Sequence, residues 1–199
     1  MNALHPITSV LATRLALSLA LLGPVLDLDR GVQAAIQHTR GPGLDRVVRV
    51  ATDVGKPTTV VGVLLGMAVF GGPVGVATAR TAVLVLIPTN VAVEVTKRTV
   101  NRRRPDGEHR RSNASFPSSH AANAFALAAV LAARWRPAAP LFWVVAAWVA
   151  WSRVYLNRHF LSDVVCGAIV GVAFAWWIGS WIEKSGVRPA KARATRLRK

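Results

Sequence analysis

The chain has 199 residues, of which 52% are hydrophobic, and it carries a formal net charge of +16. This composition is too apolar for an ordinary soluble domain and indicates a single membrane domain. The lone cysteine, Cys166, excludes an intrachain disulfide and a thiolate metal cluster. Because the basic residues lie in loops between apolar stretches, anionic membrane lipids or phosphate groups are favoured over nucleic acid as partners.

The first part of the chain is predicted to contain two membrane helices separated by a mixed segment. Residues 7–26 form an apolar span interrupted by Arg14 and Gly23-Pro24, and residues 57–79 form a second span, which Gly71-Gly72-Pro73 is expected to end or kink. Residues 27–56 alternate charged and apolar positions, with a short amphipathic helix expected after Gly41-Pro42-Gly43. This segment is interpreted either as an interfacial segment lying on the membrane or as a solvated loop with helical turns.

Four further apolar spans are predicted, at residues 81–100, 119–135, 141–157 and 161–182. Glycines spaced by four residues predict close helix–helix approach, at Gly62 and Gly66 and again at Gly167 and Gly171. The fold class is therefore all-α: a polytopic membrane helical bundle of about six transmembrane helices with a short interfacial helix. Residues 1–183 form the membrane domain, and residues 184–199 form a basic cytoplasmic tail.

The span at residues 81–100 has a polar face. Asn90, Glu94 and Lys97 share one side of the helix, because they are spaced by four and three residues. Polar groups at membrane depth are costly, so this face is expected to point inward toward a hydrated site. Asn90 and Glu94 are explained equally well as groups that hydrogen-bond to another helix.

Three polar patterns follow one another in the second half of the chain, each at the predicted end or start of a span. They are Lys97-x6-Arg104-Pro105, Pro117-Ser118-Ser119-His120 and Ser152-Arg153-x5-His159-x3-Asp163.

The last pattern has the residue types of a histidine nucleophile. If Asp163 begins a helix, its carboxylate can hydrogen-bond one imidazole nitrogen of His159 and leave the other nitrogen free to attack. Arg153 offers a planar five-donor fork that suits a phosphoryl group. Ser118 and Ser119 stand at a helix N-terminus, where they are expected to cap the helix, to bind phosphate oxygens, or both.

The three patterns, in this order, resemble those of the type-2 phosphatidic acid phosphatase superfamily, which includes lipid phosphate phosphatases, soluble bacterial acid phosphatases and vanadium haloperoxidases. The resemblance covers residues 97–163 and is to a bacterial membrane member. It departs from the family pattern at Ser119, where glycine is more common. Serine keeps the backbone N–H and slightly narrows the phosphate cradle.

The resemblance implies a catalytic mechanism and its residues. His159 attacks phosphorus and forms a phosphohistidine, His120 protonates the leaving group and then activates water, and Asp163 orients His159. The implied phosphate-binding residues are Lys97, Arg104, Ser118, Ser119 and Arg153. No metal or other cofactor is expected, since the cationic side chains supply the positive charge.

The expected function is metal-independent hydrolysis of a lipid phosphomonoester or diphosphate. Candidate substrates are undecaprenyl diphosphate, phosphatidate, phosphatidylglycerol phosphate, other prenyl phosphates and lipid A. A phosphotransferase on the same scaffold is one alternative, and a non-catalytic basic membrane protein is another. Haloperoxidase chemistry with bound vanadate is less favoured, because the relatives with that activity are soluble and larger.

Six spans place both termini on one side of the membrane. The basic tail and the turn with Arg134 and Arg136 fall on that side, so the positive-inside rule makes it cytoplasmic. All three patterns then meet on the opposite, outer face of the plasma (inner) membrane. The basic loop at residues 101–118 breaks the positive-inside bias there, and a phosphate site explains its arginines. The inverted orientation remains an alternative.

Overall fold

A computed structural model describes residues 23–110 and 113–185, and within these ranges the chain contains helices and no strands. The predicted all-α class is therefore confirmed for the described residues. Most of the predicted span at 7–26 and nearly all of the predicted tail at 184–199 lie outside these ranges. The helices are residues 23–38, α2 (Pro42–Asp53), α3 (Pro57–Phe70), α4 (Gly72–Val100), α5 (Ser119–Arg134), η2 (Arg136–Ala138), α6 (Ala139–Tyr155) and α7 (Leu161–Lys184).

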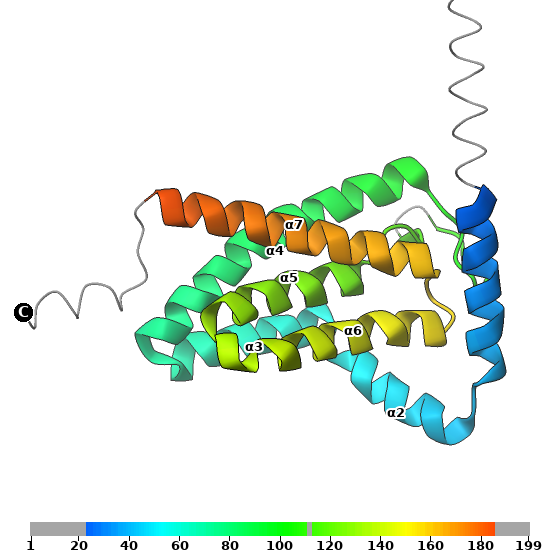
Figure 1. Cartoon of the computed structure of the whole chain (residues 1–199), viewed down its shortest axis with the longest axis horizontal. Coiled ribbons are helices and arrows are strands. Elements are labelled where there is room, and N and C mark those ends of the chain that lie inside the picture. Colours follow the sequence, from blue (N-terminus) through cyan, green and yellow to red (C-terminus); the bar gives the residue numbers. More distant parts are fainter. Residues whose placement is uncertain (1–22, 111–112, 186–199) are drawn as a thin grey trace, which may run out of the picture.

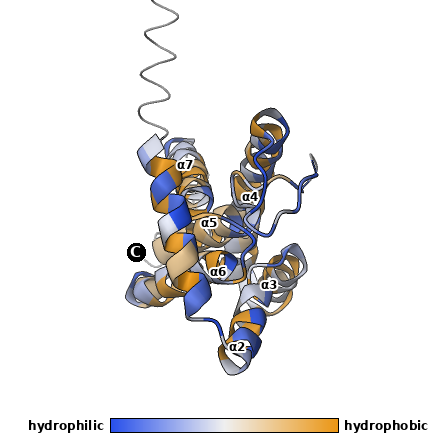
Figure 2. Cartoon of the chain, turned by 90° about the vertical axis from the view of Figure 1, so that its right-hand side faces the viewer, coloured by the Kyte–Doolittle hydropathy of each residue, from blue (hydrophilic) through white to orange (hydrophobic). Residues whose placement is uncertain are grey.

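The helices form a bundle around α5, which packs against α4, α6 and α7 (Figure 1). The helix of residues 23–38 runs across the end of the bundle where α6 stops and α7 begins. Residues 27–56 are thus two helices joined by a short turn, and the expected amphipathic helix after Gly41-Pro42-Gly43 is α2. Hydrophilic residues line the loop after α4 at this end of the bundle and alternate with hydrophobic ones along residues 23–38 (Figure 2).

The boundary between the second and third predicted spans is wrong. The sequence placed it near residue 80, but α3 ends at Phe70 and α4 begins at Gly72. Hydropathy is continuous across this point, but the helix does break at Gly71-Gly72-Pro73, where the sequence indicated an end or a kink. The reversal depends on backbone geometry, because Gly72 adopts a φ of +58° and Pro73 follows in the first turn of α4.

Two described helices are long and apolar enough to cross a membrane, namely α4 with 29 residues and α7 with 24. The apolar helix α3 is shorter, with 14 residues. At a rise of about 1.5 Å per residue, helices the length of α5 and α6 reach about 25 Å, slightly less than a bilayer core of about 30 Å. The predicted count of six spans is therefore not confirmed.

The glycine pair in α7 brings two backbones into contact. A Cβ on Gly171 would lie 2.2 Å from the carbonyl oxygen of Ala122, and one on Gly167 would lie 2.5 Å from that of Ser118. The predicted close approach is confirmed here and fixes α5 against α7. At Gly62 and Gly66 it is not confirmed, because no described atom lies within 4 Å of the added Cβ.

Candidate active site

The three sequence patterns converge at one end of the bundle. Lys97 lies in the last turn of α4, Ser118 caps the start of α5, Arg153 ends α6 and Asp163 lies in the first turn of α7. His159 lies in the turn between α6 and α7. Because antiparallel neighbouring helices place one helix's end beside the next one's start, residues far apart in sequence meet here.

The loop segment 114–118 ties these helix ends together. The Nζ of Lys97 donates to the carbonyl of Ala114 at 3.1 Å, and the backbone N–H of Ser118 donates to the carbonyl of Asp163 at 3.0 Å. The hydroxyl of Ser115 donates to Oδ2 of Asp163. Segment 114–118 is thus joined to α4 on one side and to α7 on the other.

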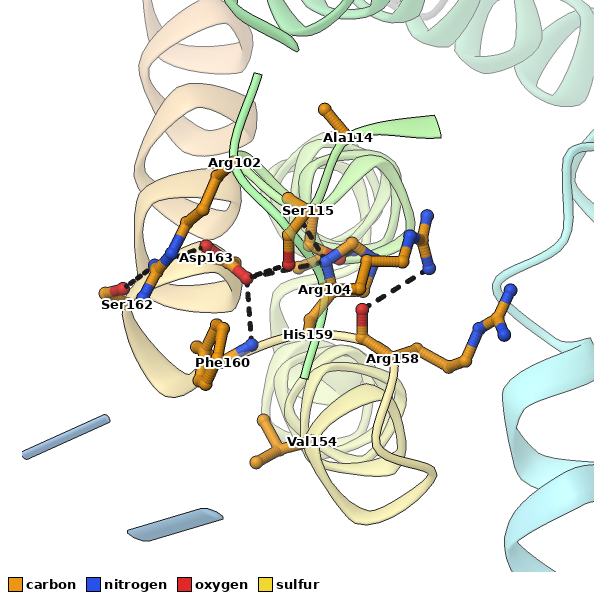
Figure 3. A network of polar contacts seen from close by, with 12 residues as sticks. Arg102, Arg104, Ala114, Ser115, Val154, Arg158, His159, Phe160, Ser162 and Asp163 are labelled. Carbon is orange, nitrogen blue, oxygen red and sulfur yellow. Dashed lines mark hydrogen bonds and ion pairs between the residues drawn. The ribbon is translucent and has the colours of Figure 1, made fainter. Parts of the chain in front are cut away.

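Segment 114–118 also fixes the tautomer of His159. Nδ1–H of His159 donates to the carbonyl oxygen of Ser115 at 2.7 Å, as Figure 3 shows. A carbonyl can only accept, so Nδ1 carries the proton and Nε2 keeps its lone pair in the neutral ring. No described residue forms a hydrogen bond to Nε2.

The predicted contact between Asp163 and His159 differs from what the structure shows. Oδ2 of Asp163 lies 3.8 Å from Nδ1 of His159, beyond hydrogen-bond distance. The same oxygen accepts the N–H of Phe160 at 2.8 Å and the Ser115 hydroxyl, so Asp163 caps α7 and holds segment 114–118. Asp163 therefore holds the backbone on both sides of the His159 ring, through Ser115 and through Phe160, and its carboxylate lies near Nδ1 without accepting a hydrogen bond from it.

Burial lowers the pKa of His159 to about 4, against the opposing effect of the nearby Asp163 carboxylate. His159 is only 1% exposed, and desolvation penalises its charged form. The ring is therefore neutral at physiological pH. The unfolded chain, with an imidazole pKa near 6.5, binds a proton that the folded chain does not bind between about pH 6.5 and 4. The free energy of unfolding consequently falls as pH drops through that window.

Asp29, which belongs to none of the three sequence patterns, also contributes a buried carboxylate at this end of the bundle. Arg102 lies between two buried acids, donating to Oδ1 of Asp163 and to Oδ2 of Asp29, each at 2.7 Å (Figure 3 shows the Asp163 side). Asp29 also accepts the backbone N–H and the hydroxyl of Ser162, at 2.8 and 2.6 Å. Asp29 therefore anchors the helix of residues 23–38 to the start of α7.

A repeat of polar residues at four-residue spacing gives the sequence signal for Asp29. Asp29, Gln33 and Gln37 share one face of the helix of residues 23–38. Gln33 donates to the carbonyl of Val154 at 3.2 Å and Gln37 to that of Tyr155 at 3.1 Å. The stripe thus satisfies carbonyls at the end of α6 that helix geometry leaves without intrahelical partners.

Three cations are buried at the same end of the bundle. Lys97, Arg104 and Arg153 are 5%, 6% and 8% exposed. Within the part of the chain that the structure describes, Lys97 donates to the Ala114 carbonyl alone, and Arg104 donates to oxygens of Asn113 and to the carbonyl of Arg158. None of the three forms an ion pair with a carboxylate of the described residues.

Arg153 is the least satisfied of the three cations. Its Nη1 donates to the hydroxyl of Thr52 at 2.8 Å, while its buried Nε has no partner among the described atoms. His120 lies close enough to Arg153, His159 and Lys97 to interact with them electrostatically. The predicted cationic residues and both predicted histidines therefore share one neighbourhood.

The start of α5 adds backbone donors. Ser118 caps the helix by accepting the N–H of Ala121 at 3.4 Å, so the capping interpretation of this serine holds in the structure. Ser119 and His120 follow as the first two residues of the helix and are half-buried. Their backbone N–H groups have no acceptor among the described residues, as expected at a helix N-terminus.

The polar face of α4 is used unevenly. Asn90 exchanges side-chain amide hydrogen bonds with Asn123 of α5, at 2.8 and 3.3 Å, which is the helix–helix interpretation. Glu94 instead forms an exposed ion pair with Arg98, one turn along the same helix. Of the three residues on the predicted face, Lys97 alone reaches the cationic neighbourhood. Among the described residues, no group of three or more His, Cys, Asp or Glu side chains is placed to hold a metal ion.

Two curated relatives match part of the chain. It is 37% identical over 95 residues to a lipid A 1-phosphatase of Porphyromonas gingivalis, covering 46% of this chain and 20% of that protein. It is 39% identical over 67 residues to a lipid A 4'-phosphatase of Bacteroides thetaiotaomicron, covering 32% of this chain and 28% of that protein. The chain thus matches less than a third of the length of either relative.

Two solved structures share the fold. The crystal structure of Aquifex aeolicus LpxE aligns with a TM-score of 0.67 at 23% identity, covering 75% of this chain and 93% of that one. The transmembrane PAP2 type phosphatidylglycerolphosphate phosphatase from Bacillus subtilis aligns with a TM-score of 0.67 at 26% identity, covering 89% and 96%. The sequence model of the PAP2 superfamily matches residues 78–186, which is more than half of the chain and includes all three sequence patterns. The chain belongs to the PAP2 superfamily of type-2 phosphatidic acid phosphatases.

Proposed function

We propose that this protein is an integral membrane lipid phosphatase in which His159 is the nucleophile. The observation that carries the proposal is a group of three buried cations that have no carboxylate partner among residues 23–110 and 113–185, beside a neutral imidazole whose Nε2 has no hydrogen-bond partner in those ranges. Burying a charge without a counter-charge costs several kcal/mol in typical proteins. A phosphate group bound among Lys97, Arg104 and Arg153 supplies the missing negative charge.

Each group has a separate part in the proposed reaction. Nε2 of His159 attacks phosphorus, and the bond between phosphorus and the leaving oxygen breaks as the phosphohistidine forms. His120 donates a proton to that oxygen and then takes one from the water that releases inorganic phosphate. Arg153, Lys97 and Arg104 stabilise the charge on the equatorial oxygens, together with the free N–H groups at the start of α5.

The substrate is proposed to be a phosphorylated lipid because the outer surface of the bundle is apolar. Large hydrophobic side chains point outward along α3, α4 and α7, including Leu65, Ile87, Ile169 and Trp176, each at least 60% exposed. A surface of this kind is unfavourable in water and suits the interior of a bilayer. The lipid A and phosphatidylglycerolphosphate phosphatases among the similar proteins are consistent with a lipid substrate.

The orientation that we propose places the site on the outer face of the plasma membrane. The cationic end of the bundle lies opposite the turn that carries Arg134 and Arg136. The positive-inside rule favours a cytoplasmic position for that short basic turn. The basic loop after α4 is accounted for by the buried site that it forms.

The test is phosphate release by the detergent-purified protein, with EDTA present, from phosphatidylglycerol phosphate, lipid A, undecaprenyl diphosphate and phosphatidate. Wild type and the exposed-histidine control His38→Ala should release phosphate, and His159→Ala should not. Equal release by wild type and His159→Ala would overturn the proposed nucleophile. Dephosphorylated lipid formed without matching inorganic phosphate would instead identify a phosphotransferase, and no turnover of any lipid would overturn the activity.

A further inference from the structure

The helix α2 is attached to the last turn of α6 at two points. Near its start, the hydroxyl of Tyr155 donates to Oδ1 of Asp45 at 2.9 Å and accepts the N–H of Gly41 at 3.3 Å. Near its end, Arg153 donates to the hydroxyl of Thr52 at 2.8 Å. Residues 52–56, the end of α2 and the turn into α3, are here called the α2–α3 turn. This segment is held directly against a residue of the proposed phosphate site, although Thr52 and Arg153 are 101 positions apart.

Thr52 is chemically suited to hold this arginine without neutralising it. The Thr52 side chain is buried, with the residue 7% exposed, and its hydroxyl is the acceptor for the Arg153 guanidinium among the described residues. A carboxylate in this position would pair with the guanidinium and compete with an incoming phosphate. A neutral hydroxyl fixes one N–H group in direction and leaves the positive charge, and the unpaired Nε, available for an anion.

The same turn also lies against His120. Gly55 is buried, and a Cβ added to it would lie 3.2 Å from Cδ2 of His120 and 2.5 Å from Cγ1 of Val149. The second distance is shorter than real Cβ contacts, so only a residue without a side chain fits between α5 and α6 at this point. The turn thus touches two of the proposed catalytic groups, one through a hydrogen bond and one through backbone packing.

We infer that Thr52 is a positioning residue for Arg153, and that the α2–α3 turn holds the guanidinium in the orientation needed for phosphoryl transfer. Thr52 lies outside the segment that matches the PAP2 superfamily, residues 78–186, and belongs to none of the three sequence patterns. The inference rests on the proposed function, because it assigns Arg153 to the transferring phosphoryl group.

The experiment compares Thr52→Val, Thr52→Ser and the matched control Thr59→Val. Valine keeps the shape of threonine and removes the hydroxyl, whereas serine restores it. Thr59 lies in the first turn of α3. Its hydroxyl donates to the carbonyl of Asp53 at 2.6 Å and does not contact Arg153. The readouts are kcat and KM for lipid phosphate hydrolysis, the inhibition constant of orthovanadate, which can adopt the five-coordinate geometry of phosphoryl transfer, and the apparent Tm.

Loss of a hydrogen bond to a charged group typically changes a rate or equilibrium constant by about 10-fold to 100-fold. We expect Thr52→Val to lower kcat by about that factor, with a smaller change in KM, and to weaken vanadate inhibition in parallel. Thr52→Ser should recover most of both, and Thr59→Val should stay near wild type. A merely structural role for Thr52 would lower the Tm and leave the vanadate inhibition constant unchanged.

Two outcomes would overturn the inference while leaving the proposed function intact: an active wild type with Thr52→Val equally active and equally sensitive to vanadate, or Thr52→Ser no better than Thr52→Val. A wild-type protein that neither hydrolyses lipid phosphates nor responds to vanadate would overturn the proposed function itself. The two failures are therefore distinguished by the wild-type measurement alone.

Discussion

The contact between α5 and α7 gives the sharpest prediction about how packing supports the site. In Gly167→Ala, the added Cβ would lie 2.5 Å from the carbonyl oxygen of Ser118 and 3.3 Å from Cβ of Ala121. Cβ atoms essentially never approach other atoms closer than 3.0 Å, so the two helices must separate by about 0.5 Å or more. The obstacle is backbone, which a side-chain rotation cannot relieve.

This displacement acts on the junction that holds the site. The clashing carbonyl belongs to Ser118, the residue that caps α5, and the N–H of Ser118 is bound to the carbonyl of Asp163. Overpacking of this kind typically costs about 1–3 kcal/mol of stability, and a misplacement near 1 Å can reduce a rate by about 100-fold. We expect Gly167→Ala to lower the apparent Tm and to reduce kcat by about 10-fold to 100-fold.

The assay is a thermal-shift measurement in detergent together with initial rates of phosphate release. Gly179→Ala is the matched control, since it lies on the same helix and no atom lies within 4 Å of its added Cβ. The control should keep wild-type activity and Tm. The reasoning is refuted if Gly167→Ala is as stable and as active as Gly179→Ala.

Three further predictions follow from the same geometry. Because burial holds the pKa of His159 near 4, the fall of kcat/KM on the acid side should occur near that pH, and a fall near pH 6.5 would contradict this. For the same reason, the decline in Tm between pH 6.5 and 4 should be smaller in His159→Asn than in wild type. Asp29→Asn leaves Arg102 with one carboxylate and should lower the Tm by several degrees, a shift absent if the pair contributes nothing. Gly55→Ala should lower kcat, whereas the control Gly62→Ala, with open space around its added Cβ, should not. Equal kcat values would show that the α2–α3 turn accommodates the added methyl group without disturbing the site.

The meeting of the three sequence patterns at one end of the bundle was predictable, because the patterns lie at helix ends. Lys97, Arg153 and Asp163 each lie within one turn of a terminus in the structure, and apolar runs locate those termini to within two residues for α5, α6 and α7. Antiparallel packing then brings the termini together. The chemistry assigned to these residues stays a prediction until the variants are measured.

The partner of Nδ1 of His159 was not predictable by the same route. The acceptor is the backbone carbonyl of Ser115, and every residue type carries such a carbonyl. Which carbonyl reaches the ring depends on the path of the 101–118 loop, which is set by contacts with α4 and α7. Asp163 has the expected place in the chain, but its oxygens are already engaged by Ser115, Phe160 and Arg102.

The exact α3–α4 boundary and the contribution of residues 23–38 were not predictable for different reasons. Gly71-Gly72-Pro73 marks the turn, but hydropathy that continues to residue 79 puts the end of the span too late. Asp29 is one of many charges in a mixed segment, and its burial against Ser162 depends on a helix that crosses the end of the bundle. The burial of Asp29 is a tertiary feature, and a local pattern does not contain it.

The central claim is that His159 carries the phosphoryl group, and direct capture of that intermediate tests it most closely. The protein would be mixed with a radiolabelled lipid phosphate, quenched within one turnover under alkaline denaturing conditions that preserve phosphohistidine, and digested for mass spectrometry. We predict a label on the peptide containing His159 in the wild-type protein and none in His159→Ala. Turnover of the lipid by the wild-type protein with label on another residue, or with none on His159, would contradict the account.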